Sequence, residues 1–338
     1  MSPLRVLSFV CAVVCAGTAC RAPEAGRGKR EEGRVTTEGG IQLAYVALGS
    51  GPDTVVVLHG GPGVDHAYLE APLQALLPGR TLIFYDQRGR GRSGVVLDSL
   101  ALAPDSDVAD LESVRRHFGL SRLTLIGHHW GAAVSALYAV RHPERVSRIL
   151  MVSPFVVHPS FAFEIGMEHT DTSGRGREAR LLAELRRAEH VTEACQVVWP
   201  TFFYGTLPDP HADTRTVGAS VCRAPADRIG QVERINYAVL SKLGYWSWRE
   251  ALHGVPVPVL VIEGSGNDMV DAAATRWAQH LPNARVLFVP GAFGFPWLGA
   301  TAAIDTAMVA FLRGNWPAGA TKPEPFVTQV SAAAASQP

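Results

Sequence analysis

The stretch LTLIGHHWGAAVSALYAVRHPE, residues 123–144, has residue types and spacing that suit covalent chemistry. An apolar run typical of a strand leads into Gly127, Gly131 follows at a spacing of four, and a helical pattern comes next. In a Gly-x-Ser-x-Gly turn, the serine stands on a sharp strand-to-helix turn that exposes its hydroxyl as a nucleophile above a parallel sheet. The central residue here is His129, so the sequence predicts this turn, residues 127–131, which we call the elbow, with a different side chain at its tip.

A parallel sheet must lie beneath such an elbow, and the sequence predicts one. From Thr54 onward, short runs rich in β-branched residues alternate with helical patterns, as in strands buried on both faces of a parallel sheet. The expected strands are residues 54–60, 81–89, 122–127, 145–154, 257–264 and 284–291, and the expected helices are residues 108–118, 130–142, 272–280 and 302–313. This alternation indicates an α/β fold with a doubly wound, mostly parallel sheet.

The predicted core is made of two segments. The alternation stops between about residues 155 and 252, where helical patterns such as REARLLAELRRAEH separate two strands that are expected to be neighbours. We therefore expect an α/β core over residues 35–154 and 253–315, with a helical cap, residues 155–252, inserted into it. Residues 21–34 are polar and charged, as in a linker, and residues 316–338 have the low-complexity composition of a disordered tail.

The first twenty residues, MSPLRVLSFVCAVVCAGTAC, have the pattern of a signal peptide and are too short for a spanning helix. Small residues directly before Cys20 resemble a bacterial lipoprotein box, although Gly17 stands where that motif usually has leucine. Cys20 is therefore a candidate for lipidation, and simple cleavage with secretion is the alternative. Both predict export, to the bacterial cell envelope or beyond it, with membrane contact only through a lipid anchor. Export would also let Cys195 and Cys222 form a disulfide within the cap.

The overall composition excludes one class of partner. The chain has 338 residues, of which 47% are hydrophobic and 18% charged, as in an ordinary globular protein. It carries 31 basic and 31 acidic residues, and its longest basic segment is the short GRGKREEGR. Binding to nucleic acid depends on neutralising phosphates with clustered basic side chains, so no nucleic-acid partner is expected.

Two further motifs, taken with the elbow, resemble a known family. HGGPG occupies residues 59–63 and DQRG residues 86–89, and together with GHHWGAA and LPNARVLFVPGAFGFPWL they resemble the proline iminopeptidase branch of the α/β-hydrolases. The resemblance covers roughly residues 35–314, cap included, and implies the α/β-hydrolase fold. The same fold hosts many activities, so it does not by itself give a function.

The resemblance also locates a Ser-Asp-His triad, and all three positions are substituted. His129 stands at the nucleophile position. The acid position, third after the glycine of VPVLVIEG, is Asn267, with Asp268 one residue later. The base position in GAFGFPWL is Gly294, and the last histidine of the chain, His280, precedes the final expected strand. Losing the whole triad costs roughly six orders of magnitude in rate in a serine protease, so ordinary hydrolysis is not expected.

The oxyanion hole implied by the resemblance is expected to survive. In the family that this chain resembles, two backbone N–H groups form the oxyanion hole. The matching groups here are those of Gly61 and Trp130, and backbone donors do not depend on side chains. Gly127 and Gly131 remain small, as the tight turn requires. Histidine is among the few non-glycine residues enriched at positive φ, so His129 is compatible with the elbow.

Several alternatives stay open. His129 could itself act as a nucleophile, because imidazole attacks acyl groups, and Ser153 or Ser265 could be a relocated nucleophile. His59, His128 and His129 could lie near one another, but no carboxylate or cysteine accompanies them at ligand-like spacing, so no metal and no cofactor are expected. The cap carboxylates that could hold a substrate amine, or could simply be solvated, are Glu164, Glu168, Glu193 and Glu233.

The leading hypothesis is an exported α/β-hydrolase-fold pseudoenzyme that holds a small-molecule ligand or a peptide end in a capped pocket. The alternative is an active aminopeptidase or esterase with unusual catalytic residues. A third hypothesis is an interaction protein whose cap contacts a partner at the cell surface.

Overall fold

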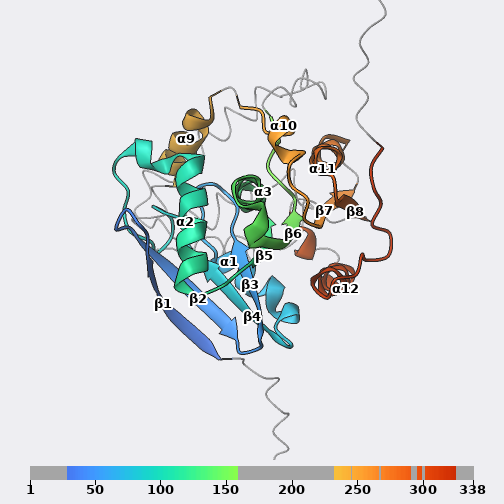
Figure 1. Cartoon of the computed structure of the whole chain (residues 1–338), viewed down its shortest axis with the longest axis horizontal. Helices are drawn as coiled ribbons and strands as arrows, with labels where there is room; N and C mark the ends of the chain where they lie inside the picture. The colour runs from blue at the N-terminus through green and yellow to red at the C-terminus, as the bar shows by residue number, and fades with distance from the viewer. Residues whose placement is uncertain are drawn as a thin grey trace, which may run out of the picture.

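The computed structural model describes residues 29–158, 232–244, 246–265, 268–290, 295–298 and 301–324. Within these ranges the backbone forms an eight-stranded sheet with helices on both faces (Figure 1). No helix in the described part of the chain is long and apolar enough to cross a membrane.

The strands follow the order β1-β2-β4-β3-β5-β6-β7-β8 across the sheet. Only β2 pairs antiparallel with its two neighbours, β1 and β4, and the remaining neighbours are parallel. This order confirms the predicted doubly wound, mostly parallel sheet. The strands are β1 (Arg30–Thr36), β2 (Gln42–Gly49), β3 (Asp53–Leu58), β4 (Arg80–Tyr85), β5 (Leu123–His128), β6 (Val146–Val152), β7 (Val259–Ser265) and β8 (Ala284–Pro290).

Both faces of the central strands are buried, as the continuous apolar runs predict. Val56 and Leu58 of β3 enter one apolar cluster, whereas Val55 and Val57 enter the other. Successive side chains of a strand point to opposite faces, so a strand buried on both faces needs apolar residues at successive positions rather than at alternate ones.

The helices divide between these two faces. On one face, α2 (Pro104–His117), α3 (Trp130–Arg141) and α11 (Asp268–His280) pack in the first cluster. On the other face, α1 (Ala67–Glu70), the 3-10 helix η1 (Pro72–Leu76) and α12 (Thr301–Leu312) pack in the second. The other described elements are η2 (Ser99–Leu102), η3 (Pro143–Arg145), α9 (Val232–Leu243), α10 (Arg249–Leu252) and η5 (Pro296–Leu298).

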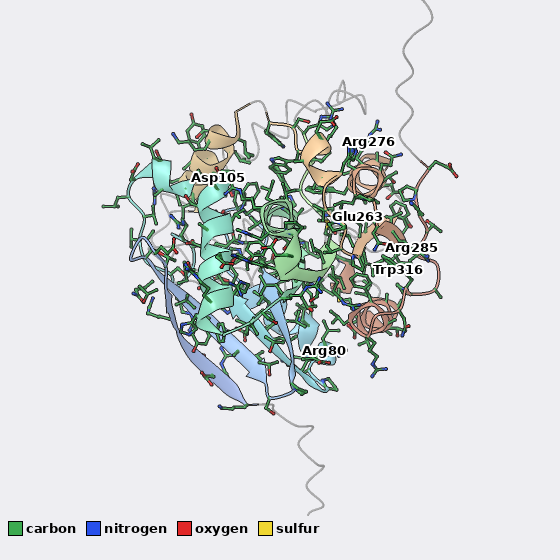
Figure 2. All side chains as sticks on the ribbon, in the orientation of Figure 1. Arg80, Asp105, Glu263, Arg276, Arg285 and Trp316 are labelled. Carbon is green, nitrogen blue, oxygen red and sulfur yellow. The ribbon has the colours of Figure 1, made fainter. Side chains whose placement is uncertain are left out.

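Two boundaries differ from the sequence-based expectation. Strand β1 begins at Arg30, inside the expected linker, because Arg30–Thr36 pairs along its whole length with β2. Part of the expected tail packs on the core: Thr321 forms an antiparallel bridge with Val286, and the Arg285 guanidinium lies 4.8 Å from the centre of the Trp316 ring (Figure 2). Neither contact was predicted, because the first segment is rich in charged residues and the second in small residues.

The topology places the elbow at the carboxyl edge of the sheet. Strands β3, β5, β6 and β7 run parallel, so the residues that follow them all emerge at one edge. In an open α/β sheet this edge is where ligands bind. It brings together the HGGPG loop, the elbow and the segments that follow β6 and β7.

Candidate functional site

The elbow predicted from the glycine spacing is present between β5 and α3. His129 has φ 47° and ψ −109°, an uncommon conformation for a residue with a side chain. Such a backbone costs about 1 to 3 kcal/mol and persists only where its surroundings impose it. Among the described non-glycine residues, His129 shares positive φ only with Ser153.

Steric crowding explains why glycines flank the tip. A Cβ on Gly127 would lie 2.5 Å from the Cα atom of Ala132, and a Cβ on Gly131 would lie 2.3 Å from the carbonyl oxygen of Leu58. Both neighbours are backbone atoms of packed elements and cannot move aside. The two glycines are therefore required for folding, whatever side chain occupies the tip.

Backbone hydrogen bonds fix the tip against the neighbouring strand. The His129 N–H donates to the carbonyl oxygen of Val152 at 3.0 Å, and the Phe155 N–H donates to the carbonyl oxygen of His129 at 3.1 Å. The end of β6 thus holds the elbow from both sides. This explains how the chain maintains a strained conformation at residue 129.

The His129 imidazole is a neutral group at pH 7. Burial lowers its pKa to about 4, and a hydrogen bond with the backbone of Gly61, which favours the protonated ring, offsets this only in part. No carboxylate of the described residues contributes to this pKa. The ring also makes an edge contact with Phe155, with 5.3 Å between ring centres. Within the described residues, the imidazole therefore has no acidic partner of the kind that orients the histidine of a triad.

The two expected oxyanion donors belong to residues next to His129: Gly61 is bonded to its ring, and Trp130 follows it in the chain. Gly61 has φ 117°, and a Cβ there would lie 2.3 Å from the amide nitrogen of Gly63, so the loop needs glycine. Trp130 is the first residue of α3, and its N–H has no acceptor within the helix. The bond between His129 and Gly61 joins the loop to the elbow.

One buried ion pair holds both donor segments. Arg90 donates from Nη1 and Nη2 to the two carboxylate oxygens of Asp107, at 2.8 and 3.0 Å. Arg90 Nε also donates to the carbonyl oxygen of Pro62, next to Gly61, at 2.7 Å, and Trp130 Nε1 donates to Asp107 Oδ2 at 2.9 Å. Neither side chain of the pair is exposed. Arg90 and Asp107 therefore position the loop and the start of α3 relative to each other.

A second buried cluster joins Asp86 to His66, three residues after the HGGPG loop. Asp86 Oδ1 accepts from the backbone N–H of His66 at 3.1 Å and lies 2.6 Å from His66 Nδ1. Burial alone would lower the pKa of His66, but the charge of Asp86 and bonds to Asp86 and Glu70 outweigh it and raise that pKa to about 9. Asp86 thus acts here as a scaffold contact to the residue that precedes α1.

The other histidines near the elbow are held by scaffold bonds. His59 is fully buried: its Nε2 accepts from the backbone N–H of Gln87 at 3.1 Å, and burial lowers its pKa to about 3. His128 Nδ1 lies 2.5 Å from the Tyr68 hydroxyl, which also accepts from the Gly60 N–H at 2.8 Å. In the described ranges, no three His, Cys, Asp or Glu side chains are grouped so that they could hold a metal ion.

Ser153 is the second strained residue and lies beside the elbow. Its φ is 45°, and its hydroxyl donates to Glu263 Oε1 at 2.8 Å. Burial raises the pKa of Glu263 to about 8, so this carboxyl group is largely protonated at pH 7 and is a poor base. Within the described residues, the side chain bonded to Ser153 is that of Glu263, which does not activate the hydroxyl. Ser265 ends β7, paired in register with Pro290 of β8.

Residues 53–299, well over half of the chain, match the family model described as the alpha/beta hydrolase fold. The chain belongs to the α/β-hydrolase fold family. A proline iminopeptidase from Lactobacillus delbrueckii subsp. lactis is 25% identical over 241 residues, covering 68% of this chain and 80% of its own length. Another from Heyndrickxia coagulans is 33% identical over 129 residues, which are 38% of this chain and 44% of that enzyme.

Solved α/β-hydrolase structures share the fold. The proline iminopeptidase of Mycobacterium smegmatis has a TM-score of 0.64 at 22% identity, covering 84% of this chain and 98% of that one. An esterase from Exiguobacterium antarcticum has a TM-score of 0.66 at 18% identity, with 84% and 100% coverage. Both likenesses establish the architecture of this α/β-hydrolase chain.

Several predicted positions of this α/β-hydrolase chain lie outside the described residues. These are the acid position Asn267, the base position Gly294, the lipidation candidate Cys20 and the disulfide candidates Cys195 and Cys222. Asp268 is the first residue of α11. Of the expected cap, residues 155–158, 232–244 and 246–252 are described, and α9 and α10 lie within them.

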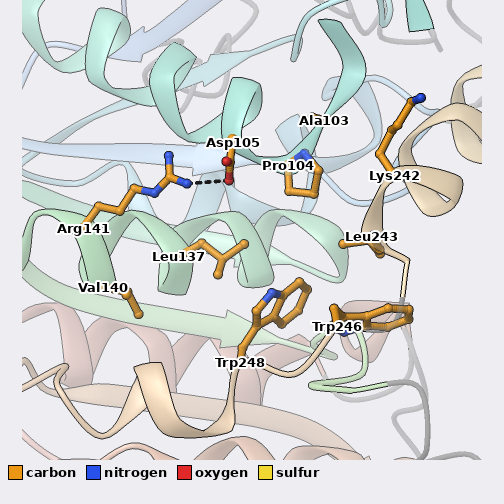
Figure 3. Close-up of a pocket in the computed structure, with 10 residues that line it drawn as sticks. All are labelled: Ala103, Pro104, Asp105, Leu137, Val140, Arg141, Lys242, Leu243, Trp246 and Trp248. Carbon is orange, nitrogen blue, oxygen red and sulfur yellow. Dashed lines mark ion pairs between the residues drawn. The ribbon is translucent and has the colours of Figure 1, made fainter. Parts of the chain in front are cut away.

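Sequence reasoning missed an aromatic cluster beside the elbow of this α/β-hydrolase chain. Phe155, which contacts His129, also stacks on Trp246, with 5.9 Å between ring centres and an interplanar angle of 22°. Trp246 and Trp248 line a cavity of about 380 Å³ between α2, α3 and the end of α9 (Figure 3). The spacing of Trp246 and Trp248, which flank Ser247, was the available signal. Phe155 and Trp246 therefore connect the elbow to this cavity.

Proposed function

We propose that this α/β-hydrolase-fold protein is a pseudoenzyme that binds a small ligand or peptide end at the elbow without cleaving it. One observation carries the proposal: the side chain at the elbow tip is a neutral imidazole whose pKa is set by burial and by the backbone of Gly61, with no carboxylate contribution from the described residues. A triad histidine needs an acid to orient it, and a triad serine needs a base. Within the described residues, His129 has no acid that orients it and no serine that it could activate.

The topology supports the absence of a replacement base. The last histidine of the chain, His280, ends α11, which starts after the carboxyl end of β7 and leads back to the amino end of β8. His280 lies against His253, with 5.6 Å between ring centres, and His253 precedes β7. Both therefore lie at the sheet edge opposite to His129. The sequence offers only Gly294 at the usual base position.

The donors that remain favour binding. Backbone N–H groups of Gly61 and Trp130 suit a carbonyl or carboxylate oxygen. A neutral imidazole offers one ring nitrogen as an acceptor, which suits an N–H or O–H group of the same ligand. The elbow therefore favours an amide or a carboxylic acid. Because curated relatives are proline iminopeptidases, prolyl compounds are the first probes to use.

The test combines a covalent probe with turnover and binding. The protein is incubated with a fluorophosphonate, with prolyl p-nitroanilide and p-nitrophenyl acetate, and with prolinamide in a thermal-shift titration. We expect no labelling, no turnover above buffer, and a thermal shift with prolinamide that is lost in His129→Phe. His129→Gln is the matched control, because its amide oxygen keeps an acceptor near the imidazole position.

Two outcomes would favour the alternative, an active hydrolase. Stoichiometric fluorophosphonate labelling mapped to Ser153 or Ser265 would show a relocated nucleophile. Turnover of either chromogenic substrate that disappears in His129→Gln would show that the imidazole attacks the substrate itself.

We also propose that residues 1–20 direct export and that Cys20 is lipidated. The pattern of the leader and the small residues before Cys20 support this. Expression in a bacterium fed radiolabelled palmitate tests it: label in the parent protein and none in Cys20→Ser is expected, and an unlabelled protein in the culture medium would favour simple secretion.

A further inference from the structure

A second cavity, of about 470 Å³, lies at the opposite end of the sheet from His129. Its walls come from the starts of β3, β4 and β6, from the turn before β5, and from Leu312 at the end of α12. All of these residues are described. Strand β5 spans six residues between the turn and the elbow edge, so about 20 Å separates the two sites. Figure 2 shows Arg80 low in the view and Glu263, near the carboxyl end of β7, well above it.

Three arginines line this cavity, and their hydrogen-bond partners are neutral backbone carbonyls. Arg80 Nη1 donates to the carbonyl oxygens of Leu76 and Pro78, at 3.3 and 3.4 Å. The other two bonds run from Arg122 Nη2 to the carbonyl oxygen of Val146, at 2.5 Å, and from Arg148 Nη1 to that of Phe311, at 2.6 Å. In the described ranges no carboxylate lies within ion-pairing distance of any of the three.

The burial of Arg80 makes this arrangement unusual for the molecule. Its side chain is only 5% exposed, whereas the similarly buried Arg90 has Asp107 as its counter-charge and the partly buried Arg88 has Asp110. A buried cation is costly unless an opposite charge or water compensates it. Both bonds of Arg80 use Nη1. Its Nε and Nη2 atoms are not among the buried atoms that lack a hydrogen-bond partner, so solvent or a ligand can reach them.

The lining indicates the charge and shape of that ligand. Among the residues that line the cavity, Asp53 is the one carboxylate against the three arginines, which leaves two positive charges in excess. Ser121, Thr124 and Ser147 add hydroxyl donors. A guanidinium fork matches the oxygens of a phosphate group, and a phosphate monoester carries close to two negative charges at pH 7. The volume lies in the range of small-molecule sites.

We propose that this cavity binds a phosphate group, carried either by a soluble phosphomonoester or by the headgroup of an anionic phospholipid. The position of the cavity is compatible with a soluble phosphomonoester and with a phospholipid headgroup. Lys29, the first described residue, accepts from the N–H of Gly49 at 2.9 Å, and Gly49 abuts the carbonyl oxygen of Arg80. The chain therefore enters the sheet at the cavity end, and a lipid anchor ahead of Lys29 would bring this end toward a membrane surface.

The experiment has two arms, run on the full mature protein. Calorimetry with glycerol 3-phosphate measures the soluble source, and flotation with phosphatidylglycerol vesicles, against pure phosphatidylcholine vesicles, measures the lipid source. We expect Arg122→Gln and Arg148→Gln each to weaken binding about tenfold in whichever arm binds, as expected for one charge-assisted hydrogen bond. Added salt should weaken binding further.

Arg34→Gln is the matched control: Arg34, like Arg122, is exposed and donates to a carbonyl oxygen, that of Arg92 at 3.0 Å, but it lies on β1 away from the cavity. Its binding should equal that of the parent. The proposal is overturned if neither probe binds, if Arg122→Gln with Arg148→Gln binds as tightly as the parent, or if Arg34→Gln weakens binding equally. None of these readouts depends on the chemistry at His129.

Discussion

Replacing Asp107 by asparagine tests whether the buried Arg90–Asp107 pair positions the loop that contains Gly61 and the start of α3. The change removes the charge that balances Arg90 and presents amide hydrogens to a guanidinium that has no exposure to solvent. It leaves the size of the side chain almost unchanged, so the effect reports electrostatics rather than packing. Breaking a buried pair from one side costs about 3 to 5 kcal/mol, because the remaining charge is left without compensation.

The matched control lies two residues away on the same helix. Asp105 also pairs with an arginine, Arg141, at 2.5 Å, but its side chain is 75% exposed (Figure 3). Exposed pairs contribute about 0 to 1 kcal/mol, so Asp105→Asn should be nearly neutral. Urea unfolding of the three proteins, followed by far-UV circular dichroism, measures the difference in free energy of unfolding.

A local readout separates positioning from general stability. Trp130 Nε1 donates to Asp107, so Asp107→Asn should change the chemical shift of the indole N–H in a folded protein, whereas Asp105→Asn should not. A loss below about 1 kcal/mol in Asp107→Asn, or equal losses in the two variants, would refute the reasoning that this pair positions the loop and α3.

Three further predictions concern titration and repair. His129 should titrate near pH 4 in NMR spectra of the folded protein, and a value above 6 would contradict burial without an acidic partner. His66→Gln should lower stability by up to about 3 kcal/mol below pH 6.5. Because the folded pKa is raised to about 9, the difference from the parent should disappear as the pH rises through 9 in urea titrations, and a constant difference would refute the role of the His66 charge. Restoring His129→Ser, Asn267→Asp and Gly294→His together should yield measurable esterase activity, whereas each change alone should yield almost none, because triad members act as a unit. A correctly folded triple variant that stays inert would show that the oxyanion donors are not in place.

The sheet and the elbow could be predicted from the sequence because their signals are local. Runs such as 55–58 are apolar at every position, and Gly127 and Gly131 mark a turn that few other residues permit. The start of strand β1 could not be predicted, because exposed charged residues such as those in Arg30–Thr36 occur in edge strands as well as in linkers.

The contacts that give the candidate sites their properties could not be predicted in this way. Ser153 and Glu263 meet although 110 residues separate them, and the cavity arginines come from three separate strand starts. The packing of Phe155 between His129 and Trp246 likewise depends on the ends of two distant segments. Such pairs depend on strand order and register, which periodicity does not specify.

The crowding at Gly127 and Gly131 separates two kinds of mutational tolerance. A change at either glycine forces backbone atoms together and is removed by selection for folding alone. A change at residue 129 alters the reaction and leaves the turn intact. A lineage released from selection for catalysis would therefore drift at the tip while keeping its flanks, and its sequences would still match the models built from active enzymes. In such a lineage the two glycines identify descent, whereas the residue between them, together with the acid and base positions, reports on catalysis.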